Sequence, residues 1–287
     1  MSKARIYLVG LCAIVALCSC DFSKHNKALV NGVGRALAEE VSRDEIEAKG
    51  EKETSVSVDG DDKLVMQTSP KGTPEQILER TGYLASYNKT TRLPNWVAWH
   101  LTAERTEGSA KRSDVDFAED TDVPEPRATD WDYYNSGYDR GHMCPAADNK
   151  WSKKAKEESF LFTNMCPQNG NLNRGDWNEM EMACRKWAKK YGGVYIVCGP
   201  ILYKGKHKTI GKNKVVVPEA FFKVVLRTGD DPQAIGFIYK NTSGNRPKDA
   251  YVNTVDEVER ITGIDFFPSL PDDVENKVEA TADIANW

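Results

Sequence analysis

The chain has 287 residues, enough for one large domain or two small ones, and its 40% of hydrophobic residues is sufficient for a core. A formal net charge of −4 excludes a protein that coats nucleic acid through overall charge. Beyond the first twenty or so residues no apolar run is long enough to cross a bilayer, which excludes a multi-span membrane protein.

The N-terminal segment has the layout of an export signal. Lys3 and Arg5 precede an apolar run from Ile6 to Leu17, which is too short for a transmembrane helix and typical of a signal core. The following Leu17-Cys18-Ser19-Cys20 resembles a bacterial lipoprotein cleavage box, with residues 1–19 as the signal peptide. We therefore expect a membrane anchor through lipidated Cys20 and a location in the cell envelope, periplasmic or surface-exposed, or secretion. An ordinary secretory signal with incidental cysteines is the alternative.

The composition divides the rest of the chain into three parts. Residues 20–75 are polar and poor in aromatic side chains, which predicts a mostly flexible tether, although residues 36–52 can form a charged helix. The folded domain is expected over residues 76–270. Residues 271–287 are expected to form an acidic C-terminal tail.

Several segments of the domain have strand character, with β-branched and aromatic residues between turn-forming ones. These segments are 83–88, 96–101, 193–199, 215–217, 220–226 and 234–239. The stretch 104–138 is polar and acidic and contains Pro124 and Pro126, which predicts a long loop. Residues 152–159 have the pattern of a short charged helix.

One amphipathic helix is predicted from about Asp176 to Tyr191. Its apolar side chains fall within an arc of about 100° that should pack on the sheet: Trp177, Met180, Cys184, Trp187, Ala188 and Tyr191. Glu181 and Arg185 lie one turn apart at the edge of this arc, so they can be held rigidly and still face a cleft. Asn173 comes just before the helix, where backbone N–H groups and the helix dipole favour an anion such as phosphate.

Four cysteines lie within the domain: Cys144, Cys166, Cys184 and Cys198. An even number in an exported protein predicts two disulfides, with three possible pairings. We favour Cys144–Cys166 and Cys184–Cys198, and four buried free thiols are the alternative. Because no two cysteines have CxxC spacing, a cysteine zinc site is not expected.

Charge is distributed unevenly along the chain. Residues 150–214 contain 14 Lys or Arg against 5 Asp or Glu, whereas residues 256–287 contain 9 acidic residues against 2 basic ones. A basic face on an acidic protein can attract a polyanion while the whole protein stays soluble. Ordinary solvated surface charge would give the same pattern.

Two stretches about thirty residues apart carry most of the candidate chemistry. The first is Asp139-Arg140-Gly141-His142, and the second is Asn173-Arg174-Gly175-Asp176-Trp177 followed by Glu181. A histidine can take a proton from water near neutral pH. An amide and a carboxylate can hold a hard cation through oxygen and water, and arginine offers phosphate oxygens a planar fork of donors. These are the parts needed to cleave a phosphodiester.

The two stretches resemble motifs of the DNA/RNA non-specific endonucleases, a family that includes the Serratia-type secreted nucleases. Four segments match in order: 136–146, 163–168, 172–177 with Glu181, and 256–267. The resemblance covers roughly residues 80–270. It implies an α+β fold of the ββα-metal (His-Me finger) type, with a mainly antiparallel central sheet flanked by helices. In that fold a hairpin presents the histidine to a helix that supplies the metal ligand.

The resemblance also implies a role for each matching residue. His142 would deprotonate the attacking water, Asn173 would bind one Mg²⁺ directly, with Mn²⁺ as a substitute, and Glu181 would hold metal-bound waters. Asn164 would help to position the histidine or the phosphate. Three arginines would bind phosphate and stabilise the developing charge: Arg112, Arg140 and Arg185.

The expected activity is metal-dependent hydrolysis of DNA and RNA with little sequence preference, because contacts to the backbone carry no base information. The resemblance implies products with a 5′-phosphate. Two other interpretations are a nucleic-acid binding or uptake protein without catalysis, and a phosphodiesterase or phosphatase acting on small esters. The presence of His142, Asn173 and Glu181 together favours the nuclease. The sequence leaves the oligomeric state open.

Overall fold

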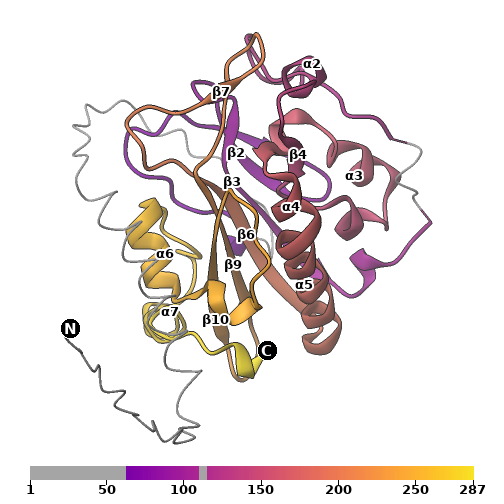
Figure 1. Ribbon diagram of the computed structural model, residues 1–287. Coiled ribbons are helices and arrows are strands. Elements are labelled where there is room, and N and C mark those ends of the chain that lie inside the picture. The colour runs from indigo at the N-terminus through magenta and orange to yellow at the C-terminus, as the bar shows by residue number, and fades with distance from the viewer. Residues whose placement is uncertain (1–62, 110–114) are drawn as a thin grey trace, which may run out of the picture.

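The computed structural model describes residues 63–109 and 115–287. A seven-stranded sheet lies at its centre, with every neighbouring pair of strands antiparallel and helices on both faces (Figure 1). The predicted α+β class, with a mainly antiparallel central sheet flanked by helices, is confirmed.

The strands of the sheet lie side by side in the order in which they occur along the chain. A long connection between β3 and β6 lies outside this sheet. The strands are β1 (Gln76–Glu79), β2 (Leu84–Asn88), β3 (Leu93–Thr102), β6 (Gly193–Ile201), β9 (Ala220–Arg227), β10 (Gln233–Lys240) and β11 (Val252–Asn253). The central strands are buried on both faces and therefore read as nearly continuous apolar runs, which made them predictable. Strand β1 was not predicted, because the four residues Gln-Ile-Leu-Glu show no alternation.

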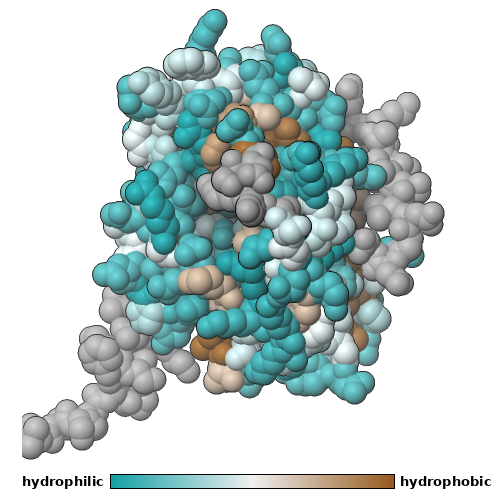
Figure 2. All heavy atoms as spheres, turned by 90° about the vertical axis from the view of Figure 1, so that its right-hand side faces the viewer, coloured by the Kyte–Doolittle hydropathy of each residue, from teal (hydrophilic) through white to brown (hydrophobic). Residues whose placement is uncertain are grey.

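Helices on one face of the sheet enclose the larger of two hydrophobic cores. Helix α4 (Gly170–Leu172) leads through a wide turn (Asn173–Trp177) into α5 (Asn178–Tyr191). The apolar arc predicted for this helix packs on the sheet, with five of its six side chains buried and Tyr191 partly so. The outer surface on the side of α3 and α5 is mostly hydrophilic (Figure 2).

The opposite face of the sheet is covered by α6 (Val255–Thr262) and α7 (Asp272–Glu279), together with a 3₁₀ turn at Lys63–Val65 (Figure 1). Val255, Val258 and Ile261 of α6 and Val278 of α7 are buried there with apolar side chains of the sheet. The two helices and α5 thus lie on opposite sides of the same strands.

The long connection between β3 and β6 contains a small hairpin of β4 (Asp139–His142) and β5 (Met165–Gln168). Helices α2 (Asp130–Tyr133) and α3 (Lys153–Glu158) flank it, and α3 confirms the short helix predicted over 152–159. A second hairpin joins β7 (Thr209–Ile210) to β8 (Val215–Val216). Short 3₁₀ turns are found at Glu104–Thr106, Ala146–Asn149, Phe162–Asn164, Lys248–Tyr251 and Ile284–Asn286.

The structure differs from the prediction at both ends of the domain. Val65 is buried, and Thr68 forms an antiparallel bridge with Asp265, so residues 63–75 pack in the fold instead of belonging to a tether. Residues 271–287 include α7, and the ring of Trp287 lies 4.9 Å from that of Trp187. The expectations for residues 1–62, including lipidated Cys20, lie outside the described residues. No helix of the described part has the length and apolarity needed to cross a membrane.

The four cysteines of the domain are free thiols, so the predicted Cys144–Cys166 and Cys184–Cys198 disulfides are not formed. All four are buried among core side chains on separate elements, where burial raises the pKa of Cys198 to about 11 and of Cys184 to about 12. They therefore behave as small neutral core residues. The prediction failed because an even cysteine count says nothing about whether two thiols meet.

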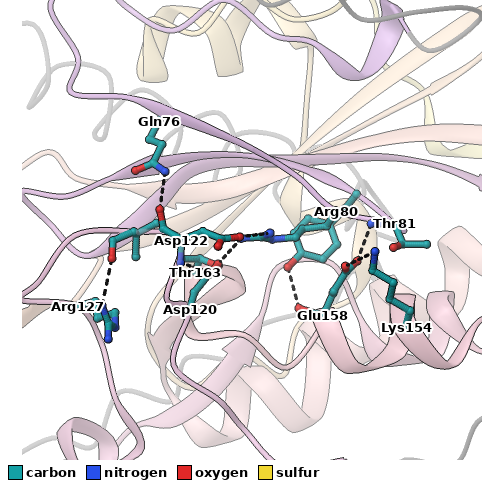
Figure 3. A network of polar contacts seen from close by, with 11 residues as sticks. Gln76, Arg80, Thr81, Asp120, Asp122, Arg127, Lys154, Glu158 and Thr163 are labelled. Atoms are coloured by element: carbon teal, nitrogen blue, oxygen red, sulfur yellow. Dashed lines mark hydrogen bonds and ion pairs between the residues drawn. The ribbon is translucent and has the colours of Figure 1, made fainter.

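A polar network attaches the segment 115–129 to the edge of the sheet and to α3 (Figure 3). The guanidinium of Arg80, just after β1, donates to the carboxylates of Asp120 and Asp122, at 2.7 Å each. Asp120 also accepts from the hydroxyl of Thr163 at 2.6 Å. The side chains of Arg80 and Asp120 are only 11% and 3% exposed, so this pair is largely shielded from water.

Replacing Arg80 with alanine leaves the carboxylate of Asp120 buried without its cation. We expect the Arg80→Ala variant to lose about 3 kcal/mol of unfolding free energy, measured by urea denaturation. The control is Lys154→Ala, which removes an exposed pair with Glu158 at 3.7 Å and should cost less than about 0.5 kcal/mol. A loss of unfolding free energy in Arg80→Ala no larger than that in Lys154→Ala would show that the Arg80–Asp120 pair does not stabilise the fold more than an exposed pair does.

Candidate active site

A cleft of about 1170 Å³ lies between the β4–β5 hairpin, the wide turn and the start of α5. Five cationic side chains and two carboxylates line it, together with a histidine and two asparagines: Arg140, Lys150, Lys156, Arg174, Arg185, Asp139, Glu181, His142, Asn173 and Asn178. The excess of positive charge in a concave site favours a polyanionic ligand.

Five of the seven predicted site residues line this one cleft: Arg140, His142, Asn173, Glu181 and Arg185. They come from a strand, a turn and a helix that are separated in sequence, so the fold brings them together. Asn164 is not among the lining residues, and Arg112 lies outside the described residues.

His142 ends strand β4, where it pairs with Met165 of β5. Its backbone oxygen accepts a hydrogen bond from the indole N–H of Trp177 at 3.2 Å. The imidazole packs edge-on against Phe160, with ring centroids 5.0 Å apart, and against Phe117 at 5.7 Å. A paired strand and two aromatic rings therefore fix the orientation of the imidazole, which a positioned general base requires.

Asn173 lies in the wide turn, between the short helix α4 and the predicted helix α5. The chain is already helical from Gly170, and Asn169 caps α4 by accepting from the N–H of Asn171 at 3.0 Å. The backbone breaks from helical geometry at Gly175, with φ −101° and ψ −112°, so two helices meet in the wide turn and α5 begins just beyond it. Asn173 therefore comes shortly before α5, as predicted, and the anion site expected there stays a prediction. The short helix α4 in front of it was not predicted.

The side-chain amide of Asn173 is oriented by Asp139. Its nitrogen donates to Asp139 Oδ2 at 3.0 Å, so the amide oxygen is the atom left for a cation. Asp139 also accepts two hydrogen bonds from the guanidinium of Arg174, at 2.9 and 2.7 Å. Partial burial acts to raise the pKa of Asp139, but the hydrogen bonds from Arg174 and Asn173 outweigh it and lower the pKa. The carboxylate is therefore ionised at neutral pH.

The connection between β10 and β11 braces the wide turn. Asp176 in the turn accepts from the backbone N–H of Arg246 at 3.2 Å and from the hydroxyl of Tyr251. The side chain of Asn241 accepts from the N–H of Asn169 at 2.7 Å. The position of Asn173 thus depends on residues 241–251 as well as on its own helix.

Glu181 and Arg185 project from α5 into the cleft one turn apart, as predicted. Arg185 Nη1 donates to Asp148 Oδ1 at 2.8 Å, and Asp148 Oδ2 accepts from the indole N–H of Trp99 at 3.2 Å. Asp148 is buried, which raises its pKa, while the cations of Arg185 and Lys223 oppose that rise. This carboxylate therefore holds the guanidinium of Arg185 at the wall of the cleft.

Lys223 lies behind this pair, in the middle of strand β9, and only 1% of it is exposed. Its ammonium is 4.3 Å from the ring centre of Trp177 and 5.3 Å from that of Trp99. Sequence reasoning missed both Asp148 and Lys223. The one available signal was a single lysine in an otherwise apolar run of seven residues, from Ala220 to Leu226.

The other two predicted residues within the described part have specific partners. Arg140 forms an ion pair with Asp130 at 2.5 Å and lies over the ring of Phe117 at 5.3 Å. Asn164 is fully buried, accepts from the N–H of Cys144 at 2.9 Å and donates to the backbone oxygens of Cys144 and Ser159. Asn164 thus holds the segment that follows His142 and does not reach the cleft.

The sequence profile of the DNA/RNA non-specific endonucleases matches residues 61–273. The chain belongs to this family. Among curated relatives of this chain, the mitochondrial nuclease EXOG of Danio rerio is 38% identical over 218 residues, which are 69% of this chain and 64% of that protein. Human mitochondrial endonuclease G is 34% identical over 209 residues, 68% of this chain and 70% of the relative.

Fungal and structural relatives agree with this assignment. Nuclease C1 of Cunninghamella echinulata is 36% identical over 222 residues, 72% of this chain and 88% of that protein. A crystal structure of the EndoG/EndoGI complex superposes with a TM-score of 0.65 at 32% identity, covering 69% of this chain and 87% of that one. The match spans less than two thirds of the length of the Danio rerio protein.

The location expected from the N-terminal sequence is wrong by this comparison. The EXOG and endonuclease G relatives are named as mitochondrial nucleases, which contradicts a lipid-anchored envelope protein or a secreted one. Membrane anchoring through Cys20 has no support among these relatives.

Removing the charge of Asp148 should leave Arg185 in the cleft without the carboxylate that orients it. We expect Asp148→Asn to lower kcat/KM on plasmid DNA roughly tenfold to a hundredfold, since small misplacements of binding groups have effects of this size. The matched control is Asp130→Asn, which removes the 56% exposed partner of Arg140 and should change kcat/KM less than about threefold. Similar losses in both variants would contradict a specific role for Asp148.

Proposed function

We propose that this chain is a metal-dependent endonuclease that hydrolyses the phosphodiester bonds of DNA and RNA with little sequence preference and leaves 5′-phosphate ends. One observation carries the proposal: His142, Asn173 and Glu181 line a single cleft together with Arg140, Arg174 and Arg185. The cleft therefore combines a candidate base, oxygen donors for a cation and several groups that bind phosphate.

The donors present in the cleft fit a hard divalent cation. Asn173 offers an amide oxygen, because its nitrogen is engaged by Asp139, and Glu181 offers a carboxylate. So few protein ligands suit Mg²⁺, which keeps several waters, and Mn²⁺ would serve as a substitute. When bound, the ion would act as a Lewis acid that offsets negative charge on the phosphate.

The side chains of the cleft divide the remaining work. His142 takes a proton from the attacking water, with its ring held by Phe160 and Phe117. Arg185, fixed by Asp148, binds a non-bridging phosphate oxygen, and Arg140 exchanges its exposed partner Asp130 for phosphate. Glu181 orients water beside the cation-binding residues.

The properties of the cleft favour a polymer over a small ester. Its volume exceeds the roughly 300–1,000 Å³ that is usual for small-molecule pockets. Its cations are spread among a strand, two helices and a turn, which suits contact with several backbone phosphates. Because such contacts do not reach base edges, sequence preference should be weak.

Loss of the base should abolish cleavage without loss of the fold. We expect His142→Ala to cleave plasmid DNA and RNA at least about a hundredfold more slowly than the parent, as measured by gel electrophoresis, and EDTA to stop cleavage by the parent. The control is His207→Ala, because His207 pairs with Glu219 at 3.0 Å and does not line the cleft.

Three results would lead to other conclusions. Cleavage by His142→Ala at the parent rate would exclude the histidine as base. DNA binding that is unaffected by EDTA, without cleavage by the parent, would indicate a binding protein. Hydrolysis of a chromogenic diester without cleavage of plasmid or RNA would indicate a phosphodiesterase for small esters.

The role of Asn173 can be tested separately through the cation requirement. We expect Asn173→Ala to raise the Mg²⁺ concentration for half-maximal cleavage at least about tenfold, because it removes the only amide oxygen proposed as a ligand. Asn171→Ala is the control, since Asn171 is exposed and its side chain donates to Ser243 at 3.2 Å. An unchanged Mg²⁺ requirement in Asn173→Ala would exclude it as a ligand.

A further inference from the structure

A second group of acidic side chains lies on the other side of the sheet from the cleft. Asp256 and Glu259 belong to α6, and Glu279 is the last residue of α7. One carboxylate oxygen from each lies within 4.8 Å of the other two. Because α6 and α7 cover the face opposite to α5, this group is separate from Asn173 and Glu181 (Figure 1).

Glu279 is an unusual member of this group because its carboxylate is buried. Only 5% of the residue is exposed, and its Oε1 has no hydrogen-bond partner among the described residues. An unpaired buried carboxylate oxygen is costly, and such groups normally have a partner. No ion pair in the described part of the chain involves Asp256, Glu259 or Glu279. By contrast, the buried carboxylate of Asp148 is paired with Arg185.

The surroundings of Glu279 add negative charge instead of offsetting it. Burial raises the pKa of Glu279 to about 8, and Glu259, Glu275, Asp256 and Asp265 contribute to the rise. Burial likewise raises the pKa of Glu259 to about 7, although this carboxylate accepts from the N–H of Phe266 at 2.7 Å. A proton or a cation bound to these three carboxylates would offset their charge.

We propose that Asp256, Glu259 and Glu279 bind a divalent cation, for which Ca²⁺ is the best match. Ca²⁺ takes six to eight oxygen ligands in flexible geometry and accepts bidentate carboxylates, whereas Mg²⁺ holds its own waters more tightly. Glu279 supplies the buried side of the site, and exposed Asp256 leaves the other side open to water. The cation ties the end of α7 to α6.

The family profile ends at residue 273, within the first turn of α7, so Glu279 lies beyond the matched region. The proposal does not depend on the endonuclease activity, and its failure would leave that activity untouched.

The test measures Ca²⁺ binding in the full chain with the cleft disabled by Asn173→Ala. Calorimetric titration at pH 7.5 after EDTA treatment should give one Ca²⁺ per chain. Saturating Ca²⁺ should raise Tm by roughly 5 °C. Adding Glu279→Gln should abolish both effects, while Asp273→Asn, an exposed change on the same helix, should preserve them. In EDTA, Glu279→Gln should have at least the Tm of its parent, which shows that it folds.

Three results would overturn the proposal. The parent could bind no Ca²⁺, or Glu279→Gln could bind it as well as the parent does. A Tm that falls as pH rises from about 5 to 8, whether or not Ca²⁺ is present, would show that a shared proton neutralises the group. Tm falls in that case because a carboxyl whose pKa is raised in the folded state stabilises the fold only while it is protonated, and this stabilisation is lost as rising pH ionises it. A larger rise in Tm with Mg²⁺ than with Ca²⁺ would overturn the assignment to Ca²⁺.

Discussion

The geometry of the cleft depends on one buried side chain, Trp177. Its indole N–H donates to the backbone oxygen of His142, and its ring packs against Phe221 and Tyr239 of the sheet. Since Trp177 ends the turn that begins at Asn173, this contact fixes the strand carrying the proposed base relative to the turn carrying the proposed ligand. The proposed base and the proposed ligand are thereby positioned against the same rigid sheet, as precise positioning demands.

The buried carboxylates on the two faces of the sheet have different partners. Behind the cleft, Asp148 has cations on two sides, Arg185 in contact and Lys223 nearby, and the indole N–H of Trp99 completes its hydrogen bonds. On the face covered by α6, the charged groups that act on the pKa of Glu279 are all acids. A charge in a low-dielectric interior needs compensation in both places. The chain supplies it internally on the first face and, in our proposal, from solution on the second.

The sequence predicted those features that depend on long periodic patterns or on spacing within motifs. The central strands and the apolar arc of α5 are of the first kind, and the meeting of His142, Asn173 and Glu181 in one cleft is of the second. The hairpin of β4 and β5 that carries His142 was expected only from the family resemblance, because its strands are four residues long and are set by mutual pairing, not by propensity. Asp148 and Arg185 are 37 residues apart and follow no local pattern, so only the fold reveals their contact.

Residues 241–251 look like an ordinary surface connection, the kind of segment where chains usually accept extra residues at little cost. Here the connection is fastened to the start of α4 at Asn169 and to the turn at Asp176. An insertion would pull on the same turn that carries Asn173. The length of this segment should therefore be under stricter selection than its exposure suggests. Tags or grafted peptides are better placed in the lysine-rich connection 204–208 between β6 and β7.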